Sequence, residues 1–345
     1  MTDETSWGGI LEEFNRLQSE AQEQSRATGK NVTLNPHALT NKYVSELFQH
    51  TQRPLLIYLA DFLNGQKAAL SGGEISIVLS DKDGIVETTR KLPPGPLDVI
   101  LHSPGGSLEA TESIVDILRS KFSEIRFFIP NAAKSAATML ALSGDEIYLA
   151  SSAELGPIDP QMILRKDGGY TQSAAQAIID QFEGAQKDIS SNPSKLPAWI
   201  PILPMYGPSL YQDSKNAIKL SKEIVRSWLV KYMFKSIPKK ATRIHKAKRV
   251  VNYFANHKLL KSHGRRIGLT EIEENLKGLL NVKKLDDDQL LYSKVMAVYY
   301  CFQHVFLRSP AFKIIENHLG NRYVRQIQVP QPIQLPLMSQ PPQNP

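Results

Sequence analysis

The sequence predicts an α/β fold with a largely parallel sheet built from βαβ units, followed by a helical C-terminal region. Runs of branched and aromatic residues typical of buried strands occur at residues 55–59, 97–101 and 125–129. Helical patterns follow the second and third runs, at residues 107–122 and 136–142. Because a helix between two strands returns the chain to the same end of the sheet, this alternation indicates parallel pairing.

The composition is that of a globular protein with three parts. Its 345 residues, of which 41% are hydrophobic, are enough for one large domain with additions or for two domains. We expect residues 1–53 to form an amphipathic helix, over residues 8–27, and a polar connection, over residues 31–54. Residues 54–320 form the central domain with its helical extension. Residues 321–345 are rich in Pro and Gln, which predicts a disordered tail or a ligand for another protein.

Shorter patterns define further elements of the central domain. Residues 75–79 are a strand candidate, residues 80–84 a turn, and the Pro-rich stretch at residues 92–96 a hard break. Beyond the strand region we expect residues 171–188 to form a helix. Residues 192–208 contain five prolines and Trp199, and we expect them to form an ordered loop or an extended arm. We expect residues 209–319 to be mainly helical.

Two turns rich in small residues follow the second and third strand-like runs. The first is His-Ser-Pro-Gly-Gly-Ser at residues 102–107, and the second is Asn-Ala-Ala-Lys-Ser-Ala-Ala at residues 131–137. Each turn opens a helix, with Ser107 as the expected N-cap of the first. Ser135 then lies at a helix N-terminus, where unpaired N–H groups and the helix dipole stabilise an oxyanion. The two turns together predict a hydrolase site with Ser135 as the nucleophile.

The residues of these turns resemble the Clp-fold serine peptidases, which include the Clp protease proteolytic subunit and signal peptide peptidase. The closest resemblance is to the serine dehydrogenase proteinase (SDH) family, whose pattern is matched by Glu-Leu-Gly-Pro-Ile-Asp-Pro-Gln at residues 154–161. The resemblance covers residues 55–320. It implies a ClpP/crotonase-like fold and a serine endopeptidase that cleaves peptide or protein substrates through an acyl-enzyme on Ser135. It also implies a homo-oligomer and no metal or organic cofactor.

Ser135 needs a base, and the sequence offers two candidates. Resemblance to the SDH family implies a triad of Ser135, Asp159 and His263, in the chain order Ser, Asp, His. In this order, Asp and His have exchanged places relative to the Clp protease. If nothing else changed, the carboxylate would lie beside the serine and the imidazole behind it. Because the base must contact the serine hydroxyl, this triad requires local shifts of the backbone. The alternative base is Lys187, in a segment that resembles the one carrying the lysine base of signal peptide peptidase. A desolvated lysine deprotonates serine without histidine. We favour His263 and keep Lys187 as the alternative.

We nominate the backbone N–H groups of Gly106 and Ala136 as the oxyanion hole, with Gly105 allowing the turn. His102 belongs to the same turn, and we expect it to order the turn rather than to catalyse. If these residues are not catalytic, the alternative is that Ser135 only caps a helix and Asp159 only caps a turn.

Net charge, cysteine content and hydrophobicity limit the other classes of protein to which this chain could belong. The formal net charge of +7 is concentrated in a basic segment at residues 235–266. Because Val250, Val251 and Phe254 interleave with the charges at helical spacing, we interpret this segment as a solvated helix face rather than a nucleic-acid site. The single cysteine, Cys301, excludes an internal disulfide framework. An acidic N-terminus and the lack of a long apolar run favour a soluble, cytoplasmic protein without a transmembrane segment.

Two other functions compete with the peptidase. A crotonase-type enzyme uses the same fold for acyl-CoA chemistry, but the Ser-Pro-Gly-Gly and Gly-Pro-Ile-Asp-Pro-Gln sequences argue against it. A non-catalytic assembly or adaptor protein would keep the fold and recruit partners through its tail and basic segment. The chain has no P-loop sequence, so energy-dependent unfolding of substrates would require an unfoldase or adaptor partner.

Overall fold

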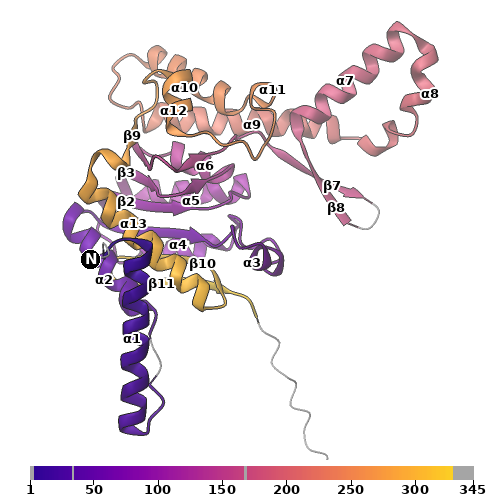
Figure 1. Ribbon diagram of the computed structural model, residues 1–345. Helices are drawn as coiled ribbons and strands as arrows, with labels where there is room; N and C mark the ends of the chain where they lie inside the picture. Colours follow the sequence, from indigo (N-terminus) through magenta and orange to yellow (C-terminus); the bar gives the residue numbers. More distant parts are fainter. Residues whose placement is uncertain (1–3, 33–34, 167–168, 329–345) are drawn as a thin grey trace, which may run out of the picture.

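The computed structural model describes residues 4–32, 35–166 and 169–328 of the chain. Its core is a seven-stranded sheet in the order β11-β10-β1-β2-β3-β5-β9 (Figure 1). Five neighbouring strands run parallel: β1 (Leu55–Ala60), β2 (Gly95–His102), β3 (Phe122–Ile129), β5 (Glu146–Leu149) and β9 (Val282–Lys284). Two antiparallel strands, β10 (Ala311–Asn317) and β11 (Arg322–Gln326), complete one edge. The predicted α/β fold with a largely parallel sheet is confirmed.

The central strands are hydrophobic along most of their length because helices cover the sheet. Every residue of β1 and of β10 is buried. Leu56 of β1 pairs with Val99 of β2, and Val99 pairs with Phe127 of β3. Parallel strands end at the same side of a sheet, so the turns that follow β2 and β3 leave the sheet beside each other.

Two groups of helices pack against this sheet. α1 (Trp7–Thr28), α2 (His37–Thr51) and α13 (Gln289–Arg308) pack on one another, and α13 crosses in front of the sheet in Figure 1. α4 (Asp81–Thr89) and α5 (Leu108–Lys121) pack against each other and belong to the crossovers between the first parallel strands. None of the helices within the described residues is both long and apolar enough to cross a membrane.

A helical layer adjoins the β3 and β5 side of the sheet. It consists of α9 (Leu210–Lys231), α10 (Lys240–Phe254), the short α11 (His257–Leu260) and α12 (Leu269–Leu276). In α10 the apolar residues of the basic segment, among them Val250, Val251 and Phe254, are buried. The charges of this helix therefore lie on its outer face, as the interleaved pattern predicts.

An arm projects from this layer (Figure 1). We use this term for residues 161–209, which begin with the hairpin of β7 (Gln161–Lys166) and β8 (Gly169–Ala174) and continue into α7 (Ala175–Ser191). The Pro-rich stretch at residues 192–208 forms short helical turns: η1 (Pro193–Lys195), α8 (Leu196–Trp199) and η2 (Leu203–Tyr206). The expected ordered arm is thus present, with more helix than predicted.

The predicted polar connection at residues 31–54 is wrong, because most of it is helix α2. This helix buries one face against α13 through residues at helical spacing: Leu39, Tyr43, Val44 and Leu47. The polar residues between them obscured the pattern. The predicted amphipathic helix at residues 8–27 is correct, since α1 covers this stretch and buries Ile10 and Phe14.

The strand candidate at residues 75–79 and the turn at residues 80–84 are also wrong. Only Ile77 makes a β-bridge, and α4 begins at Asp81. A buried charge explains the difference, because the Asp81 carboxylate accepts a hydrogen bond from the Val78 N–H at 2.9 Å and turns the chain into the helix. This tertiary contact overrides the strand propensity of the branched residues.

Strands also interrupt regions that were expected to be helical or disordered. The predicted helix at residues 171–188 starts late, because β8 extends to Ala174. The mainly helical stretch at residues 209–319 contains β9 and β10. The predicted tail at residues 321–345 loses its first part to β11, and residues 329–345 lie outside the described residues.

Candidate active site

Ser135 lies in a tight turn between a short strand and a helix. Three elements frame the turn: β4 (Ala132–Ala133), its parallel partner β6 (Glu154–Leu155) and α6 (Ala136–Leu142). Ser135 has φ 51° and ψ −121°, a conformation that residues with a Cβ rarely adopt. The Ala137 N–H closes the turn by donating to the Lys134 carbonyl at 2.8 Å. The turn presents the half-buried Ser135 at the N-terminus of α6, as the sequence predicts.

The glycines of the first turn pack directly against the Ser135 turn. Gly105 has φ 93°, and a Cβ on it would lie 2.5 Å from the Lys134 carbonyl oxygen and 2.7 Å from the Ser135 Cβ. Gly106 has φ 153°, and a Cβ there would lie 2.3 Å from the Ile77 carbonyl oxygen. Only glycine fits at these two positions without moving the backbone. The structure therefore brings the two turns together in one site.

Two backbone N–H groups at this junction are available to an anion. The Ile77 N–H donates to the Gly105 carbonyl at 2.7 Å, and the Ser107 N–H donates to the Ile77 carbonyl at 2.9 Å. The Gly106 N–H therefore points to the opposite side of this strand-like segment. Ala136 is the first residue of α6, where an N–H has no acceptor within the helix. Across the described part of the chain, neither N–H makes a hydrogen bond.

The side chains around the first turn have supporting positions. Ser107 caps α5, since its Oγ accepts a hydrogen bond from the Ala110 N–H at 3.1 Å, as predicted. His102 is buried with its Nδ1 3.2 Å from the Ala132 carbonyl oxygen, and its ring packs against Phe62. Burial lowers the pKa of His102 to about 3, so this imidazole is neutral at physiological pH. Its position, between the end of β2 and β4, agrees with the predicted ordering role.

Asp159 and His263 lie 104 residues apart in the sequence and are in contact. The Asp159 side chain is buried, and its Oδ1 lies 2.8 Å from the His263 Nδ1. This contact leaves the Nε2 of His263 free of Asp159, as in the Asp–His part of a Ser-His-Asp triad. The loops around residues 159 and 263 thus bring these two predicted residues into contact.

Backbone pairing places these loops beside the serine turn. Leu155 of β6 exchanges two hydrogen bonds with Ile267, each 3.0 Å long, and the same strand pairs with β4, which ends two residues before Ser135. The Gly156 N–H donates to the Thr138 Oγ1 of α6 at 2.9 Å. One short strand, β6, therefore connects the nucleophile turn with the segment that follows His263.

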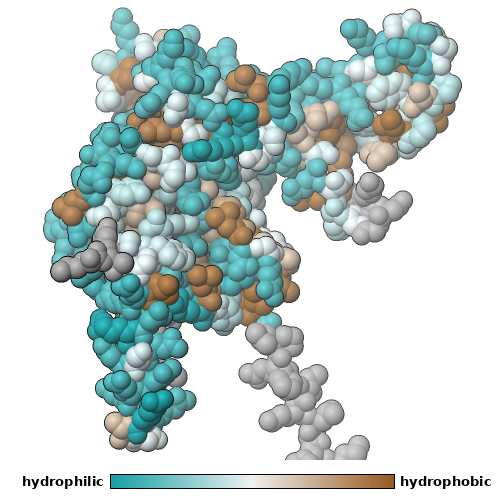
Figure 2. Space-filling view, viewed as in Figure 1, coloured by the Kyte–Doolittle hydropathy of each residue, from teal (hydrophilic) through white to brown (hydrophobic). Residues whose placement is uncertain are grey.

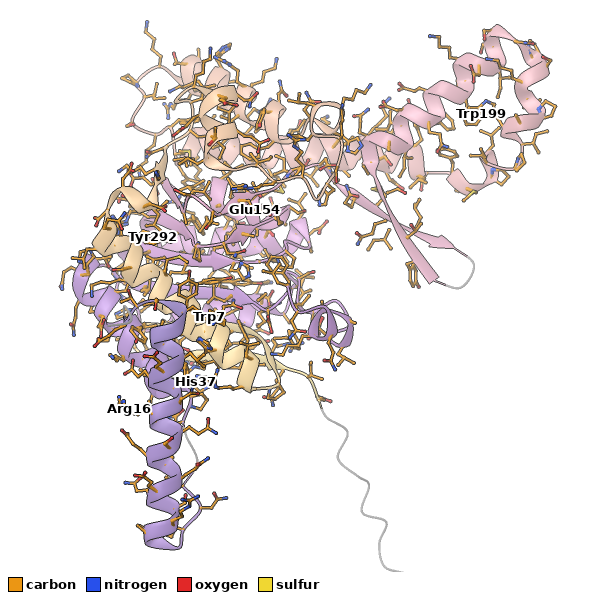
Figure 3. All side chains as sticks on the ribbon, viewed as in Figure 1. Trp7, Arg16, His37, Glu154, Trp199 and Tyr292 are labelled. Carbon is orange, nitrogen blue, oxygen red and sulfur yellow. The ribbon has the colours of Figure 1, made fainter. Side chains whose placement is uncertain are left out.

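An ion-pair cluster reinforces the same junction. Glu154 pairs with Lys134, the residue before Ser135, and its carboxylate lies 3.5 Å from the Arg266 Nε. Figure 3 shows Glu154 on the core, close to where the arm departs.

Within the described residues, no hydrogen bond joins Ser135 to a histidine. Such contacts often tighten only when a substrate binds.

Lys187 is not part of this arrangement. It is exposed on α7, in the arm, and Figure 3 shows Trp199 at the far end of the arm, well away from Glu154. No hydrogen bond or ion pair in the described part of the chain connects Lys187 with Ser135. The structure thus groups the serine turn, the glycine turn and the Asp159–His263 pair, and leaves Lys187 apart.

Sequence reasoning missed a second histidine on Asp159. The Nδ1 of His257 lies 3.0 Å from the Asp159 Oδ2, and the Gln161 Nε2 donates to the same oxygen at 3.1 Å. Both histidines belong to the basic segment at residues 235–266, but only His263 was predicted to contact Asp159, by resemblance to the SDH family. The short distance between His257 and His263 in the sequence is the one feature that could have indicated a role for His257. No spacing rule joins His257 to a carboxylate 98 residues earlier.

Comparison with known proteins confirms the family resemblance over part of the chain. Residues 75–191 match the ClpP-like SDH-type serine proteinase family. This segment includes both turns, Ser135 and Asp159, whereas His257 and His263 lie beyond it. The segment that carries the candidate nucleophile is therefore similar to that family.

Individual relatives cover similarly limited parts. Two uncharacterized proteins of Methanocaldococcus jannaschii are 34% and 36% identical over 112 and 87 residues, which are 32% and 25% of this chain. These matches span 37% and 30% of the relatives' own lengths. The crystal structure of the ClpP protease catalytic domain from Plasmodium falciparum is 13% identical with a TM-score of 0.33, over 68% of this chain and 86% of that one.

Proposed function

Because residues 75–191 match the SDH-type family, we propose that this chain is a serine endopeptidase that hydrolyses peptide bonds through an acyl-enzyme on Ser135. The observation that carries the proposal is the strained Ser135 turn, with φ 51°, packed against Gly105. A helix cap alone needs neither a positive φ nor a glycine in close contact. The combination fits a hydroxyl that is held in place to attack a substrate.

His263 is the proposed general base. Its Nε2 takes the Ser135 hydroxyl proton as Oγ bonds to the substrate carbonyl carbon, and the proton then passes to the leaving amine nitrogen as the C–N bond breaks. Water next attacks the acyl-enzyme while His263 takes its proton. That proton returns to the Ser135 Oγ as the ester bond breaks and the product acid leaves. Asp159, 2.8 Å from Nδ1, orients the ring and stabilises the imidazolium in both steps.

The proposed oxyanion hole consists of the Gly106 and Ala136 N–H groups. Both belong to backbone segments fixed by neighbouring hydrogen bonds, so they need no reorganisation when negative charge forms on the substrate oxygen. Such a donor typically lowers the barrier by roughly 3 kcal/mol. This chemistry requires neither a metal ion nor an organic cofactor.

A fluorophosphonate probe followed by peptide mapping tests the nucleophile. We expect a covalent label on Ser135 in the wild type and none in Ser135→Ala. At matched folding and oligomeric state, loss of label in His263→Ala but not in Lys187→Ala supports the histidine base. The reverse result makes Lys187 the base. A folded preparation whose site is open but which takes no label supports the non-catalytic adaptor function instead.

We also propose that the chain self-associates through the arm. Three side chains there are largely exposed although apolar or aromatic, Ile163 at 68%, Tyr170 at 78% and Met205 at 67%. Figure 2 shows hydrophobic residues on this part of the molecule, away from the core. Exposed apolar groups on a projecting element favour a protein contact. Size-exclusion chromatography with light scattering should give an oligomer that Ile163→Asp weakens, and a wild-type monomer at micromolar concentration would contradict the proposal.

A further inference from the structure

We propose that His257 is a positioning residue, which fixes the Asp159 carboxylate so that His263 keeps its working orientation. This inference rests on the proposed function and adds one residue to it. His263 lies 2.8 Å from Oδ1 of Asp159, and His257 lies 3.0 Å from Oδ2. A carboxylate that is held at both oxygens cannot rotate about its Cβ–Cγ bond without breaking a hydrogen bond.

His257 is itself held by rigid elements. It is the first residue of α11, whose N-terminus is capped by Asn256, because the Asn256 Oδ1 accepts a hydrogen bond from the Leu259 N–H at 3.0 Å. The Phe254 carbonyl accepts from the Ile158 N–H at 2.9 Å, one residue before Asp159. A backbone bond and the His257 side chain thus join the same two segments, so the carboxylate is fixed at two neighbouring points.

Burial makes this contact more than a surface ion pair. The Asp159 side chain is 3% exposed and the His257 side chain 21% exposed. Hydrogen bonds to a shielded carboxylate are stronger than exposed ones, and networks of such bonds reinforce one another. Gln161 adds a third donor to the carboxylate, the second at Oδ2, which increases the free energy needed to turn the carboxylate.

The surroundings of the two imidazoles differ, and this difference assigns their roles. The Lys134 Nζ lies 3.5 Å from the Arg265 carbonyl oxygen, so the loop that carries His263 adjoins the residue before Ser135. His257 instead lines a pocket of about 410 Å³ at the base of the arm, together with Gln176, Lys222 and Asn252. We therefore assign proton transfer to His263 and orientation of Asp159 to His257.

Asparagine separates positioning from proton transfer. The Nδ2 of an asparagine at position 257 would occupy the place of the imidazole Nδ1 and still donate to Asp159, whereas asparagine cannot accept and return a proton at neutral pH. His257→Ala removes the donor, and His257→Asn keeps it. The same two substitutions at position 263 form the matched control.

The experiment measures the second-order rate of Ser135 labelling by a fluorophosphonate in the full chain, with folding checked by circular dichroism and urea unfolding. We expect His257→Ala to be roughly tenfold slower than wild type and His257→Asn to be within about threefold of it. We expect both His263 variants to fall by at least about a hundredfold. Rescue by asparagine at 257 but not at 263 is the signature of a positioning role.

Two results would overturn the inference. Labelling of His257→Ala at the wild-type rate would show that the carboxylate needs no second anchor. A His257→Asn variant as slow as His257→Ala, with His263→Asn still active, would make His257 the base. Failure of the proposed function is a different result, because the wild type would then carry no label on Ser135 before any histidine is changed.

Discussion

The two halves of the candidate site are built by different means. The nucleophile half, formed by Ser135, Gly105 and Gly106, depends on backbone conformation at the ends of adjacent parallel strands. The base half, formed by Asp159 and His263, depends on side-chain hydrogen bonds between distant loops. The first half is sensitive to added volume, and the second is sensitive to the identity of single atoms. Substitutions should therefore act sterically in one half and chemically in the other.

The largest expected effect is the loss of the nucleophile. Ser135→Ala should lower the rate of peptide hydrolysis by at least about 10⁴-fold, because the remaining site can only bind and polarise the substrate. The matched control is Ser143→Ala, at the other end of α6. The Ser143 hydroxyl donates a hydrogen bond to the Leu140 carbonyl oxygen. Initial rates of cleavage of a peptide substrate measure both. Activity retained by Ser135→Ala, or lost equally in the control, would contradict the assignment.

Added volume should break the nucleophile half while leaving the base half intact. Gly105→Ala should reduce the rate by roughly a hundredfold, because its Cβ would lie 2.5 Å from the Lys134 carbonyl oxygen and displace the serine turn. Gly95→Ala is the control, since Gly95 also has a positive φ, of 121°, but no heavy atom lies within 4 Å of its Cβ position. Equal rates for the two variants would contradict the claim that crowding of the Ser135 turn at position 105 governs activity.

The neutral, buried His102 should make the fold acid-sensitive. Its pKa is lowered by burial from 6.5 to about 3, so between these values the unfolded chain binds a proton that the folded chain does not. The contribution of His102 to the folding free energy is therefore fully present above pH 6.5 and is lost as the pH decreases toward 3, by up to about 1.4 kcal/mol per pH unit.

Urea unfolding of His102→Asn measures this contribution. Between pH 6.5 and pH 4.5 its unfolding free energy should decline less steeply than that of the wild type. His37, whose pKa burial lowers to about 4, is common to both proteins and cancels in the comparison. Parallel slopes for the two proteins would contradict a neutral His102.

The smallest expected effect belongs to the arm. Lys187→Ala should leave the labelling rate of Ser135 within about twofold of wild type, because Lys187 is exposed on α7 and does not contact the site. The same fluorophosphonate assay checks it. A loss of labelling comparable with that of His263→Ala would indicate that Lys187, in the arm, acts as the base.

The contrast between the halves also explains what the sequence could predict. Ser135 and the two glycines are recognisable because the constraint on each is local, in a turn of a few residues. His257 was missed because its partner is 98 residues away and only folding brings them together. The Asp159–His263 pair was predicted by resemblance, not by a physical pattern in the residues.

Strand β10 was missed for a related reason. Its buried residues include Lys313 and Glu316, so the segment does not show the apolar pattern of an interior strand. Lys313 is neutralised by Asp81, 2.8 Å away, and Glu316 by Arg322. Such charges are tolerated inside a protein only when paired, and the sequence does not reveal the pairing.

The most direct test of the central claim, that Asp159 and His263 act as one unit on Ser135, is a double-mutant cycle in the rate of fluorophosphonate labelling. The cycle compares wild type, Asp159→Asn, His263→Ala and the double variant. We predict that the double variant labels within about threefold of the rate of His263→Ala, because Asp159 acts only through the imidazole. A double variant slowed by the product of the two separate losses would show that the residues act independently and would contradict the triad.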